Sequence, residues 1–339
     1  MKVLLFSEGK NTFSRSGVGQ ALNHQKEALG ANNIEYTLDP SDSYDIAHIN
    51  TIGLKSWNVL KKAKKAGKPV IYHTHTTYED FRGSIKFSNQ LAPIIRFWAR
   101  KLYNNADYLI SPTEYTKKLM EEKYLKAPKE IRVISNGVNT EKFCKNEELK
   151  NIFLKEYGIN KPLIITAGLP FERKGIRDFI EIVEKCPDYQ FIWFGSSSIK
   201  PMLPKKIQRI IDNPPKNLLF PGYVEKDILI GAFSAAKAFL FMTYEENEGI
   251  VVLEALSSRL PLVVRDIPVY DGWLSDGENC LKGRDNNEFY KKIVSVVNRK
   301  VKNIDEIIEN GNKIAKDRDL VKIGMEYRRY YEEILKLEK

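Results

Sequence analysis

The chain has 339 residues, of which 42% are hydrophobic and 29% are charged, and its formal net charge is +10. This length suits two domains of average size, and the composition is that of a globular protein rather than a disordered or fibrous one. No apolar run approaches the roughly 20 residues that span a bilayer. The apolar stretch at the N-terminus is shorter than the core of a signal peptide and is typical of a first β-strand. We therefore expect the protein to be made and kept in the cytoplasm.

The positive charge is concentrated in the first part of the chain. Residues 1–150 contain 24 Lys and Arg against 16 Asp and Glu, whereas residues 151–339 contain 30 against 28. A basic surface of this kind can bind nucleic acid or an anionic membrane, or can have no specific partner. The three cysteines stand far apart without histidines at ligand spacing. We expect reduced thiols, and neither a disulfide framework nor a zinc site.

Apolar strands and amphipathic helices alternate along the first part of the chain. The strands are expected at residues 3–6, 45–50, 69–73, 108–113 and 131–137, and the helices at about 19–29, 57–66, 93–104 and 114–122. Such alternation predicts a parallel sheet with helices on both faces. After Asn139 the pattern breaks into a polar, charged segment before it restarts.

The second part of the chain repeats this pattern. Strands are expected at residues 162–168, 191–196, 217–224, 238–243, 260–266 and 279–283, a helix at about 175–186, and helical structure over the last 40 or so residues. The sequence therefore predicts an α/β fold of two doubly wound, Rossmann-like domains with parallel sheets, which face each other across a cleft. We place the domains at 1–155 and 156–324, and the last helix, 325–339, could pack back on the first domain. In such sheets ligands bind at the carboxyl ends of the strands.

A loop with glycines or cations follows the first strand of each predicted domain. In SRSGVGQA, residues 14–21, Gly17 and Gly19 let the backbone approach a pyrophosphate at a helix N-terminus. This segment is not a complete fingerprint, and an ordinary tight turn explains two glycines about as well. In GLPFERKG, Arg173 and Lys174 precede a helix start, where two cations suit a diphosphate. A solvated basic turn is the simpler alternative.

The segment TYEENEGIVVLEALS, residues 243–257, carries the strongest signal. Glu246 precedes Gly249 at the transition from loop to helix, and Glu254 lies one turn or more inside the helix. One carboxylate can accept hydrogen bonds from a sugar hydroxyl and the other from a ribose, while the N–H groups between them face phosphate. An acidic cluster at a helix N-terminus is the simpler alternative, but it does not explain the glycine or Glu254. A glycosidase with two catalytic carboxylates is a rival interpretation, which the phosphate-binding context disfavours.

The segment ENEGIVVLE closely resembles the E-x7-E signature of glycosyltransferase family 4, whose members are retaining enzymes of the GT-B fold. Further segments match this family in the same order over nearly the whole chain: SGVG, DIAHIN, SNGVNTEKF, ERKG, PGYV and LVVRDIP. More narrowly, LNHQ, GLKSWNVL, HTHTTYEDFRGS and RDIPVYDGWL resemble Gram-positive glycolipid synthases. The resemblance implies an enzyme that moves glucose or galactose from a UDP-sugar to α-monoglucosyl-diacylglycerol and forms a diglycosyl-diacylglycerol.

The resemblance also assigns roles to the matching positions. Glu246 would hold the donor hexose, and His75 would sit against it at the reacting centre. The other donor-binding positions would contact the ribose, the diphosphate, the base and the hexose: Gly17, Gly19, Arg173, Lys174, Tyr223, Val224, Gly249, Ile250, Val251 and Glu254. Because strand side chains alternate between faces, we expect only one of His73 and His75 to point into the cleft, and we take His73 as structural. Many members have Arg where this chain has Leu169, so we expect Arg173 to supply that charge.

We expect neither a protein nucleophile nor a metal ion in the reaction. No G-x-S-x-G elbow occurs in the sequence, and in retaining family 4 enzymes the leaving phosphate is thought to take the proton of the acceptor. The one D-x-D segment, residues 317–319, lies in the helical C-terminal region, where a solvated charge cluster is the better interpretation. Cations and helix N-termini would replace Mg²⁺. No cofactor is expected, and the UDP-sugar is a substrate.

Two predicted helices, in residues 55–68 and 93–103, combine aromatic and basic side chains. This composition is typical of helices that lie on anionic membranes, and we expect a peripheral association with the inner face of the cell membrane. The residues expected at the membrane are Trp57, Lys61, Lys62, Lys64, Lys65, Arg96, Trp98, Arg100 and Lys101. The alternative is a pair of soluble helices whose tryptophans belong to the core. No nucleic-acid partner is expected, because no known binding motif accompanies the charge.

Two other functions stay open at this point. The first is a family 4 enzyme with a soluble or polyprenol-linked acceptor, which would not require liposomes. The second is a non-catalytic protein that binds a nucleotide sugar or an anionic surface through the same fold. Replacement of Glu246 separates catalysis from binding, because transfer should be lost while folding is intact.

Overall fold

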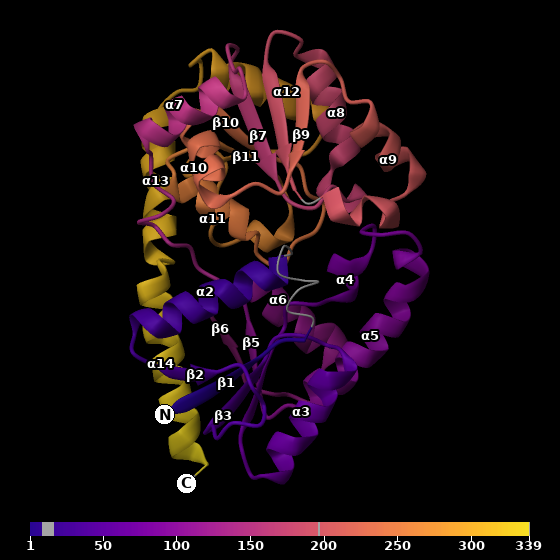
Figure 1. The fold of residues 1–339 in the computed structure, drawn as a ribbon, viewed down its shortest axis with the longest axis vertical. Helices are drawn as coiled ribbons and strands as arrows, with labels where there is room; N and C mark the ends of the chain where they lie inside the picture. Colours follow the sequence, from indigo (N-terminus) through magenta and orange to yellow (C-terminus); the bar gives the residue numbers. More distant parts are fainter. Residues whose placement is uncertain (9–16, 196, 339) are drawn as a thin grey trace. The chain divides into compact units, whose positions relative to one another are not determined.

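A computed structural model of the protein describes residues 1–8, 17–195 and 197–338. Its contacts divide the chain into two compact units. The first unit comprises Met1–Arg82, Phe87–Gly137 and Arg318–Lys339, and the second comprises Gly83–Lys86 and Val138–Asp317. In the described part of the chain, each unit is built on one six-stranded sheet with helices packed against it (Figure 1).

The first sheet is parallel throughout, in the order β2-β1-β3-β4-β5-β6. Its strands are β1 (Lys2–Phe6), β2 (Glu35–Thr37), β3 (Ile46–Ile49), β4 (Val70–His73), β5 (Tyr108–Ser111) and β6 (Ile131–Val133). The helices of this unit are α2 (Gly17–Ala31), α3 (Leu54–Lys65), α4 (Tyr78–Phe81), α5 (Ser88–Asn105), α6 (Glu114–Leu119), the π-helical turn η1 (Met120–Tyr124) and α14 (Leu320–Leu337).

Successive side chains of β1 enter two different cores, one on each face of the sheet. Leu4 and Phe6 pack with residues of α3 and α5, whereas Val3 and Leu5 pack with residues of α2 and α14. Strand side chains alternate between faces, so a strand covered by helices on both sides is apolar at every position. Helix α14 packs closely on α2 because Gly324 has no side chain, and a Cβ there would overlap the carbonyl oxygen of Ala28.

The second sheet is also parallel, in the order β12-β11-β10-β7-β8-β9. Its strands are β7 (Leu163–Ala167), β8 (Gln190–Phe194), β9 (Leu218–Gly222), β10 (Ala238–Phe241), β11 (Leu262–Arg265) and β12 (Leu281–Gly283). Its helices and turns are α7 (Glu147–Glu156), η2 (Glu172–Lys174), α8 (Ile176–Lys185), η3 (Ser197–Met202), α9 (Lys205–Asp212), α10 (Lys226–Ala235), α11 (Ile250–Ser257), η4 (Pro268–Tyr270), α12 (Asn286–Val297) and α13 (Ile304–Asp317). No helix of the described residues is long and apolar enough to cross a membrane.

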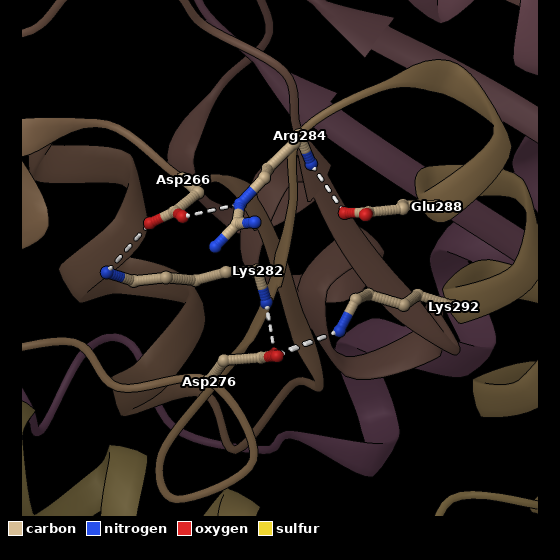
Figure 2. Close-up of a pocket in the computed structure, with 6 residues that line it drawn as sticks. All are labelled: Asp266, Asp276, Lys282, Arg284, Glu288 and Lys292. Carbon is tan, nitrogen blue, oxygen red and sulfur yellow. Dashed lines mark hydrogen bonds and ion pairs between the residues drawn. The ribbon is translucent and has the colours of Figure 1, made fainter.

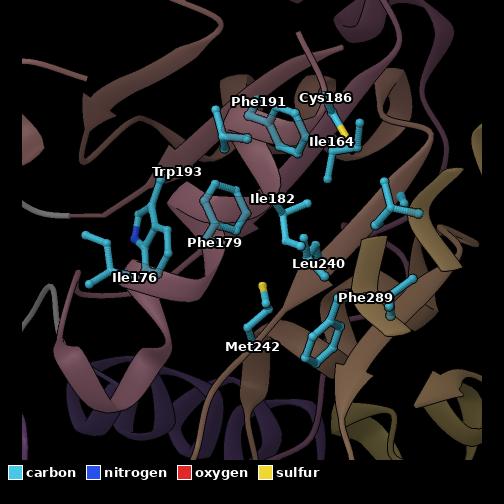
Figure 3. Close-up of a cluster of buried hydrophobic side chains, with 14 of the residues drawn as sticks. Ile164, Ile176, Phe179, Ile182, Cys186, Phe191, Trp193, Leu240, Met242 and Phe289 are labelled. Carbon is cyan, nitrogen blue, oxygen red and sulfur yellow. The ribbon is translucent and has the colours of Figure 1, made fainter. Parts of the chain in front are cut away.

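Aromatic side chains fill the core on one face of the second sheet (Figure 3). Phe179 of α8 contacts Phe191 and Trp193 of β8 edge to face, at 5.7 and 5.1 Å between ring centroids. Contacts of this geometry add to the stabilisation that comes from burying the rings. The packed core fixes the positions of the strands, and therefore the positions of the loops that follow their carboxyl ends.

The boundary between the units differs from the expected boundary at residue 155. Residues 138–155 belong to the second unit, because α7 packs against α10 so closely that a Cβ on Gly231 would overlap the backbone at Leu149. Residues 318–324, expected in the second domain, belong to the first unit together with the rest of α14. The short segment 83–86 also belongs to the second unit. The break in composition after Asn139 lies close to the start of the second unit, but the assignments of 83–86 and 318–324 depend on tertiary contacts.

Candidate active site

The turn after β7 presents two cations. Arg173 and Lys174 lie in η2, and Gly175 ends the turn with a φ of 75°. A side chain at this position would be strained, and its Cβ would overlap the carbonyl oxygen of Met242. Since β7 pairs with β10, this close approach holds the two cations against the loop that follows β10.

The loop after β10 places Glu246 against these cations. The Lys174 ammonium forms an ion pair with Oε1 of Glu246, and Nη1 of Arg173 lies 3.8 Å from the same oxygen. Thr243 Oγ1 donates a hydrogen bond to it at 3.0 Å. The carboxylate is buried, so the cations compensate a charge that would otherwise be costly to remove from water. The structure thus brings together three predicted donor-site residues, of which Lys174 and Glu246 lie 72 positions apart.

The second predicted carboxylate, Glu254, is buried in α11, and its charge is less well compensated by cations than that of Glu246. Burial raises the pKa of its carboxyl from 4.5 to about 7, and the charge of Lys226 acts in the opposite direction. Helix α11 begins after Gly249, whose φ of 91° is readily adopted only by glycine. Tyr223 is exposed and Val224 is half-buried, and both follow β9 directly before α10. The predicted base position therefore lies in the connection between β9 and α10, and the predicted ribose position lies inside α11, which follows β10 in the same unit.

Two side chains in this region were not predicted from the sequence. The hydroxyl of Tyr270 is buried and has no hydrogen-bond partner among the described residues, and a Cβ on Gly249 would lie 3.6 Å from it. The guanidinium of Arg265 lies 3.8 Å from the ring centroid of Tyr244 and pairs with Asp178 at 2.8 Å. The only available signal was that both lie in segments resembling the family. The predicted Ile250 and Val251 are the half-buried first residues of α11.

In the first unit, His75 lies just beyond the end of β4 and is buried. Its ring stacks on that of His73, at 3.8 Å between centroids and 10° between planes. The expectation that the two histidines face opposite ways is therefore wrong, because residues two apart on an extended chain share a face. Burial lowers the pKa of His75 from 6.5 to about 3, so its imidazole is neutral near pH 7.

The predicted glycines of the first unit lie at the start of α2. Gly17 is exposed and is the first residue of the helix, and Gly19 is half-buried in its first turn. A Cβ on Gly17 would meet no atom of the described residues within 4 Å, so that part of the structure does not by itself require glycine there. Residues 14–16 of the same segment lie outside the described residues.

Helices α3 and α5 contact each other through two tryptophans. Trp57 and Trp98 are half-buried, pack against the core of the first unit, and have ring centroids 6.1 Å apart. The ammonium groups of Lys101 and Lys61 lie 4.6 and 5.5 Å from the centroid of the Trp57 ring. The tryptophans thus form part of the edge of the core, as in the alternative of two soluble helices that the sequence left open.

The predicted membrane cations fall into two groups. Lys61, Lys62, Lys64, Lys65 and Lys101 are exposed, and Lys64 pairs with Asp107. Arg96 and Arg100 are instead half-buried and donate to the carbonyl oxygens of Lys123 and Tyr124, each at 3.3 Å.

Sequence reasoning missed a set of exposed apolar side chains, four in these helices and one, Phe87, directly before α5. They are Leu54, Phe87, Leu91, Ile94 and Phe97, which are 71%, 71%, 43%, 64% and 73% exposed. We refer to these five residues as the apolar ridge. Their spacing of three to four residues between 87 and 97 is typical of one face of a helix. The prediction from the sequence relied instead on the tryptophans.

An open depression of about 590 Å³ in the second unit is lined by charged residues (Figure 2). They are Asp266, Asp276, Lys282, Arg284, Glu288 and Lys292. Lys282 and Arg284 pair with Asp266 at 3.4 and 3.2 Å, and Lys292 pairs with Asp276 at 2.9 Å. The three cations and three carboxylates compensate one another, and none of the predicted site residues lines this depression. We assign no ligand to it.

The two parallel sheets, with cations after β7 and a carboxylate loop after β10, define a Rossmann-like glycosyltransferase fold of the GT-B type. The structure of Anabaena Alr3699/HepE in complex with UDP-glucose matches with a TM-score of 0.80 and 17% identity, covering 98% of this chain and 100% of that chain. Sucrose-phosphate synthase from Thermosynechococcus elongatus matches with a TM-score of 0.82 and 15% identity, covering 99% and 100%. At these identities the likeness shows the fold alone.

Two family descriptions match the sequence: Glycosyltransferase Family 4 over residues 30–142 and Glycosyl transferases group 1 over residues 121–321. The chain belongs to the group 1 glycosyl transferases. It is 43% identical to the processive diacylglycerol alpha-glucosyltransferase of Acholeplasma laidlawii, over 100% of both chains. It is also 29% identical to the alpha-galactosylglucosyldiacylglycerol synthase of Streptococcus pneumoniae, over 71% of this chain and 65% of that relative.

Proposed function

We propose that the protein transfers glucose or galactose from a UDP-sugar to a diacylglycerol glycolipid, α-monoglucosyl-diacylglycerol, with retention of configuration at the anomeric carbon. The observation that carries this proposal is the 43% identity to a processive diacylglycerol alpha-glucosyltransferase over the whole of both chains. The complex of a structural neighbour with UDP-glucose supports a UDP-sugar as the donor. UDP-glucose and UDP-galactose are α-linked, so an α-linked product corresponds to retention.

The ion-pair cluster around Glu246 supports a donor-binding role for this loop. A diphosphate beside Arg173 and Lys174 would compete with Glu246 for both cations, because phosphate oxygens are strong acceptors of charge-assisted hydrogen bonds. The carboxylate could then accept hydrogen bonds from the hexose hydroxyls. Glu254 would bind the ribose. The other proposed donor contacts are Tyr223 and Val224 at the base, and Gly17, Gly19, Gly249, Ile250 and Val251 at the phosphates and hexose.

The proposed reaction forms no covalent intermediate with the protein. The bond between the anomeric carbon and the diphosphate oxygen breaks, and the acceptor hydroxyl oxygen bonds to the anomeric carbon on the same face. The proton of that hydroxyl passes to the departing diphosphate. Arg173 and Lys174 stabilise the charge that develops on the diphosphate oxygens. His75 contacts the donor hexose as a neutral imidazole.

We propose that no metal ion takes part in this reaction. The D-x-D segment near the C-terminus, which could suggest a metal site, has a structural role: the carboxylate of Asp319 accepts a hydrogen bond from the backbone of Val321 at 2.9 Å and caps α14. We expect transfer to proceed at the same rate in EDTA as in MgCl₂. A loss of activity in EDTA that Mg²⁺ restores would show that a metal is needed.

The apolar ridge supports a membrane-bound acceptor. Leu91, Ile94 and Phe97 are spaced by three residues, so they share one side of α5. The exposed lysines of α3 and α5 lie on the same pair of helices and suit anionic headgroups, while the ridge suits the acyl boundary beneath them. We propose a peripheral association with the inner face of the cell membrane through this surface.

The test is transfer from radiolabelled UDP-glucose and UDP-galactose to vesicles of phosphatidylglycerol that contain monoglucosyl-diacylglycerol. Glu246→Gln keeps the shape of the side chain and removes its charge, and we expect kcat to fall about 100-fold or more with an unchanged circular dichroism spectrum. Glu245→Gln is the matched control, because it removes a neighbouring carboxylate from the same loop and should retain activity. Wild-type activity in Glu246→Gln contradicts the donor site. Transfer only to soluble or polyprenol-linked acceptors contradicts the proposal that the acceptor is a diacylglycerol glycolipid.

A further inference from the structure

Three buried histidines stack in a column in the first unit. The ring of His73 lies between those of His48 and His75, at centroid distances of 5.4 and 3.8 Å. Burial lowers the pKa of His48 and of His75 to about 3, and it lowers that of His73 in the same direction. The other titratable groups that the described residues bring against the column are phenols of α14: Tyr331, whose hydroxyl lies 2.7 Å from His48 Nδ1, and Tyr327. A neutral column of this kind is oriented by its hydrogen bonds.

Asn50 is the hydrogen-bond partner that reaches His75. Its Oδ1 lies 3.1 Å from Nε2 of His75 and 2.9 Å from Nε2 of Gln25. Gln25 Nε2 also lies 2.8 Å from Nδ1 of His73, so the Gln25 amide links His73 to Asn50, which itself contacts His75. An amide oxygen can only accept a hydrogen bond, so the contact with Asn50 places a proton on Nε2 of His75. In the neutral ring Nδ1 is then the acceptor nitrogen.

This network is poorly explained by stability alone. Among the described residues, Gln25 Oε1, Asn50 Nδ2 and Nε2 of both His48 and His73 are buried without a hydrogen-bond partner. Each such atom costs on the order of 1–3 kcal/mol, which apolar side chains of similar volume would avoid. Asn50 and His75 also follow the adjacent parallel strands β3 and β4. That is the edge where sheets of this type bind their ligands.

We propose that Asn50, held by Gln25, is the positioning residue of His75: it fixes the plane of the imidazole and keeps the proton on Nε2. This inference rests on the proposed role of His75 at the donor hexose. It makes Nδ1 the acceptor nitrogen of the ring and excludes the ring as a general acid near neutral pH. Gln25 acts one step further away, through its hydrogen bond to Oδ1 of Asn50.

Two substitutions of Asn50 test this role. Asn50→Leu removes the acceptor at similar volume, and we expect kcat to fall about 10- to 100-fold with little change in KM for the UDP-sugar. Asn50→Asp keeps an acceptor oxygen but adds a charge that favours the imidazolium form of His75. We expect near wild-type kcat above about pH 8 and a loss as the pH falls below 7, which the wild type lacks. An unchanged pH profile in Asn50→Asp would overturn the proposal.

Asn312→Leu is the matched control for these variants. Asn312 is a buried amide of the second unit, and its Nδ2 donates to the carbonyl oxygens of Leu256 and Ser257 at 3.3 and 3.0 Å. Its loss should lower stability but leave the pH profile of kcat unchanged. A shift of the profile in this control would show that loss of any buried amide produces the effect, and would also overturn the proposal.

The role of His75 and the role of Asn50 can fail separately. If Asn50 acts through His75, Asn50→Leu causes no further loss of kcat in a His75→Ala background. Wild-type kcat in His75→Ala refutes the proposed role of His75. The positioning role is refuted if the losses of kcat in the two single variants multiply in the double variant. It is also refuted if His75→Ala lowers kcat and Asn50→Leu does not. Nitrogen NMR of the four histidines determines the tautomer of each ring without an activity assay. We expect His75 to be protonated at Nε2, and protonation at Nδ1 would overturn the proposal.

Discussion

Among the single residues of the proposed donor site, Glu254 is expected to respond to pH near neutrality, because burial raises the pKa of its carboxyl to about 7. The ribose hydroxyls donate to the ionised form, so that form should bind the UDP-sugar better. Between pH 6 and 8 the ionised fraction rises from roughly one tenth to nine tenths, and we expect KM for the UDP-sugar to fall several-fold. Glu254→Gln should make KM independent of pH. A wild-type KM that does not change over this range contradicts the ribose assignment.

Sequence reasoning succeeds at the residue scale where a side chain directly follows a strand. Adjacent parallel strands end at the same edge of a sheet, and the cations after β7 do meet Glu246 after β10. It does not find Asn50, Gln25 or Tyr270. Their contacts join elements far apart in the chain, and the local periodicity of a sequence does not encode the side chain that a buried polar group will meet. Identifying them required the packed structure.

At the scale of the elements, the N-terminus of α3 is capped by a residue of the segment that follows β1. Its N-cap residue, Gly53, provides no side-chain cap, and Glu8 after β1 accepts hydrogen bonds from the backbone of Ser56 at 3.0 Å and of Lys55 at 3.3 Å. We expect Glu8→Ala to lower the free energy of unfolding by about 0.5–2 kcal/mol in urea denaturation. Gly53→Ala should also destabilise, because its Cβ would overlap the Glu8 carboxylate. The loss of stability caused by Gly53→Ala should be smaller in the Glu8→Ala background. Strictly additive losses would contradict the contact between Glu8 and the start of α3.

The apolar ridge gives a second prediction at this scale. The double variant Ile94→Gln/Phe97→Gln removes two exposed apolar side chains from α5 without introducing a charge. Full burial of such a side chain is worth about 1.5–3 kcal/mol, so sedimentation with phosphatidylglycerol vesicles should show binding at least about tenfold weaker. Ile152→Gln, at an exposed apolar position of α7, is the control and should bind like the wild type. Unchanged binding of the double variant would mean that the ridge does not enter the bilayer.

The periodicity of the sequence locates most elements to within a few residues, because alternating apolar strands and amphipathic helices leave a local pattern. Some elements depart from the predicted bounds. The expected strand 131–137 ends at Val133, and the helix predicted at 114–122 changes to a π-helical turn from Met120. The segment 83–86 belongs to the second unit because its backbone bonds to the turn after β7, where Arg173 N donates to the carbonyl of Gly83.

At the scale of the whole molecule, the buried histidines of the first unit and the buried Glu254 of the second respond to pH in opposite directions. In the first unit His48 and His75 have pKa values of about 3, below the value of 6.5 in an unfolded chain. The unfolded chain therefore binds more protons below pH 6.5, and this unit loses stability as the pH falls. In the second unit the pKa of Glu254 is about 7, above its unfolded value of 4.5. The folded unit then holds the extra proton and gains stability as the pH falls from 7 to 4.5.

A change from pH 7 to pH 5 should therefore separate the stabilities of the two units. At about 1.4 kcal/mol per pKa unit, His48 and His75 together destabilise the first unit by about 4 kcal/mol, whereas Glu254 stabilises the second by about 2 kcal/mol. A single melting temperature does not resolve this, because a chain of two units need not unfold in one step. Hydrogen exchange by mass spectrometry, along a urea series at each pH, assigns a free energy of unfolding to each unit. Glu254→Gln should abolish the gain of the second unit alone, and a shift of both units in the same direction in the wild type would contradict the assignment of these buried groups.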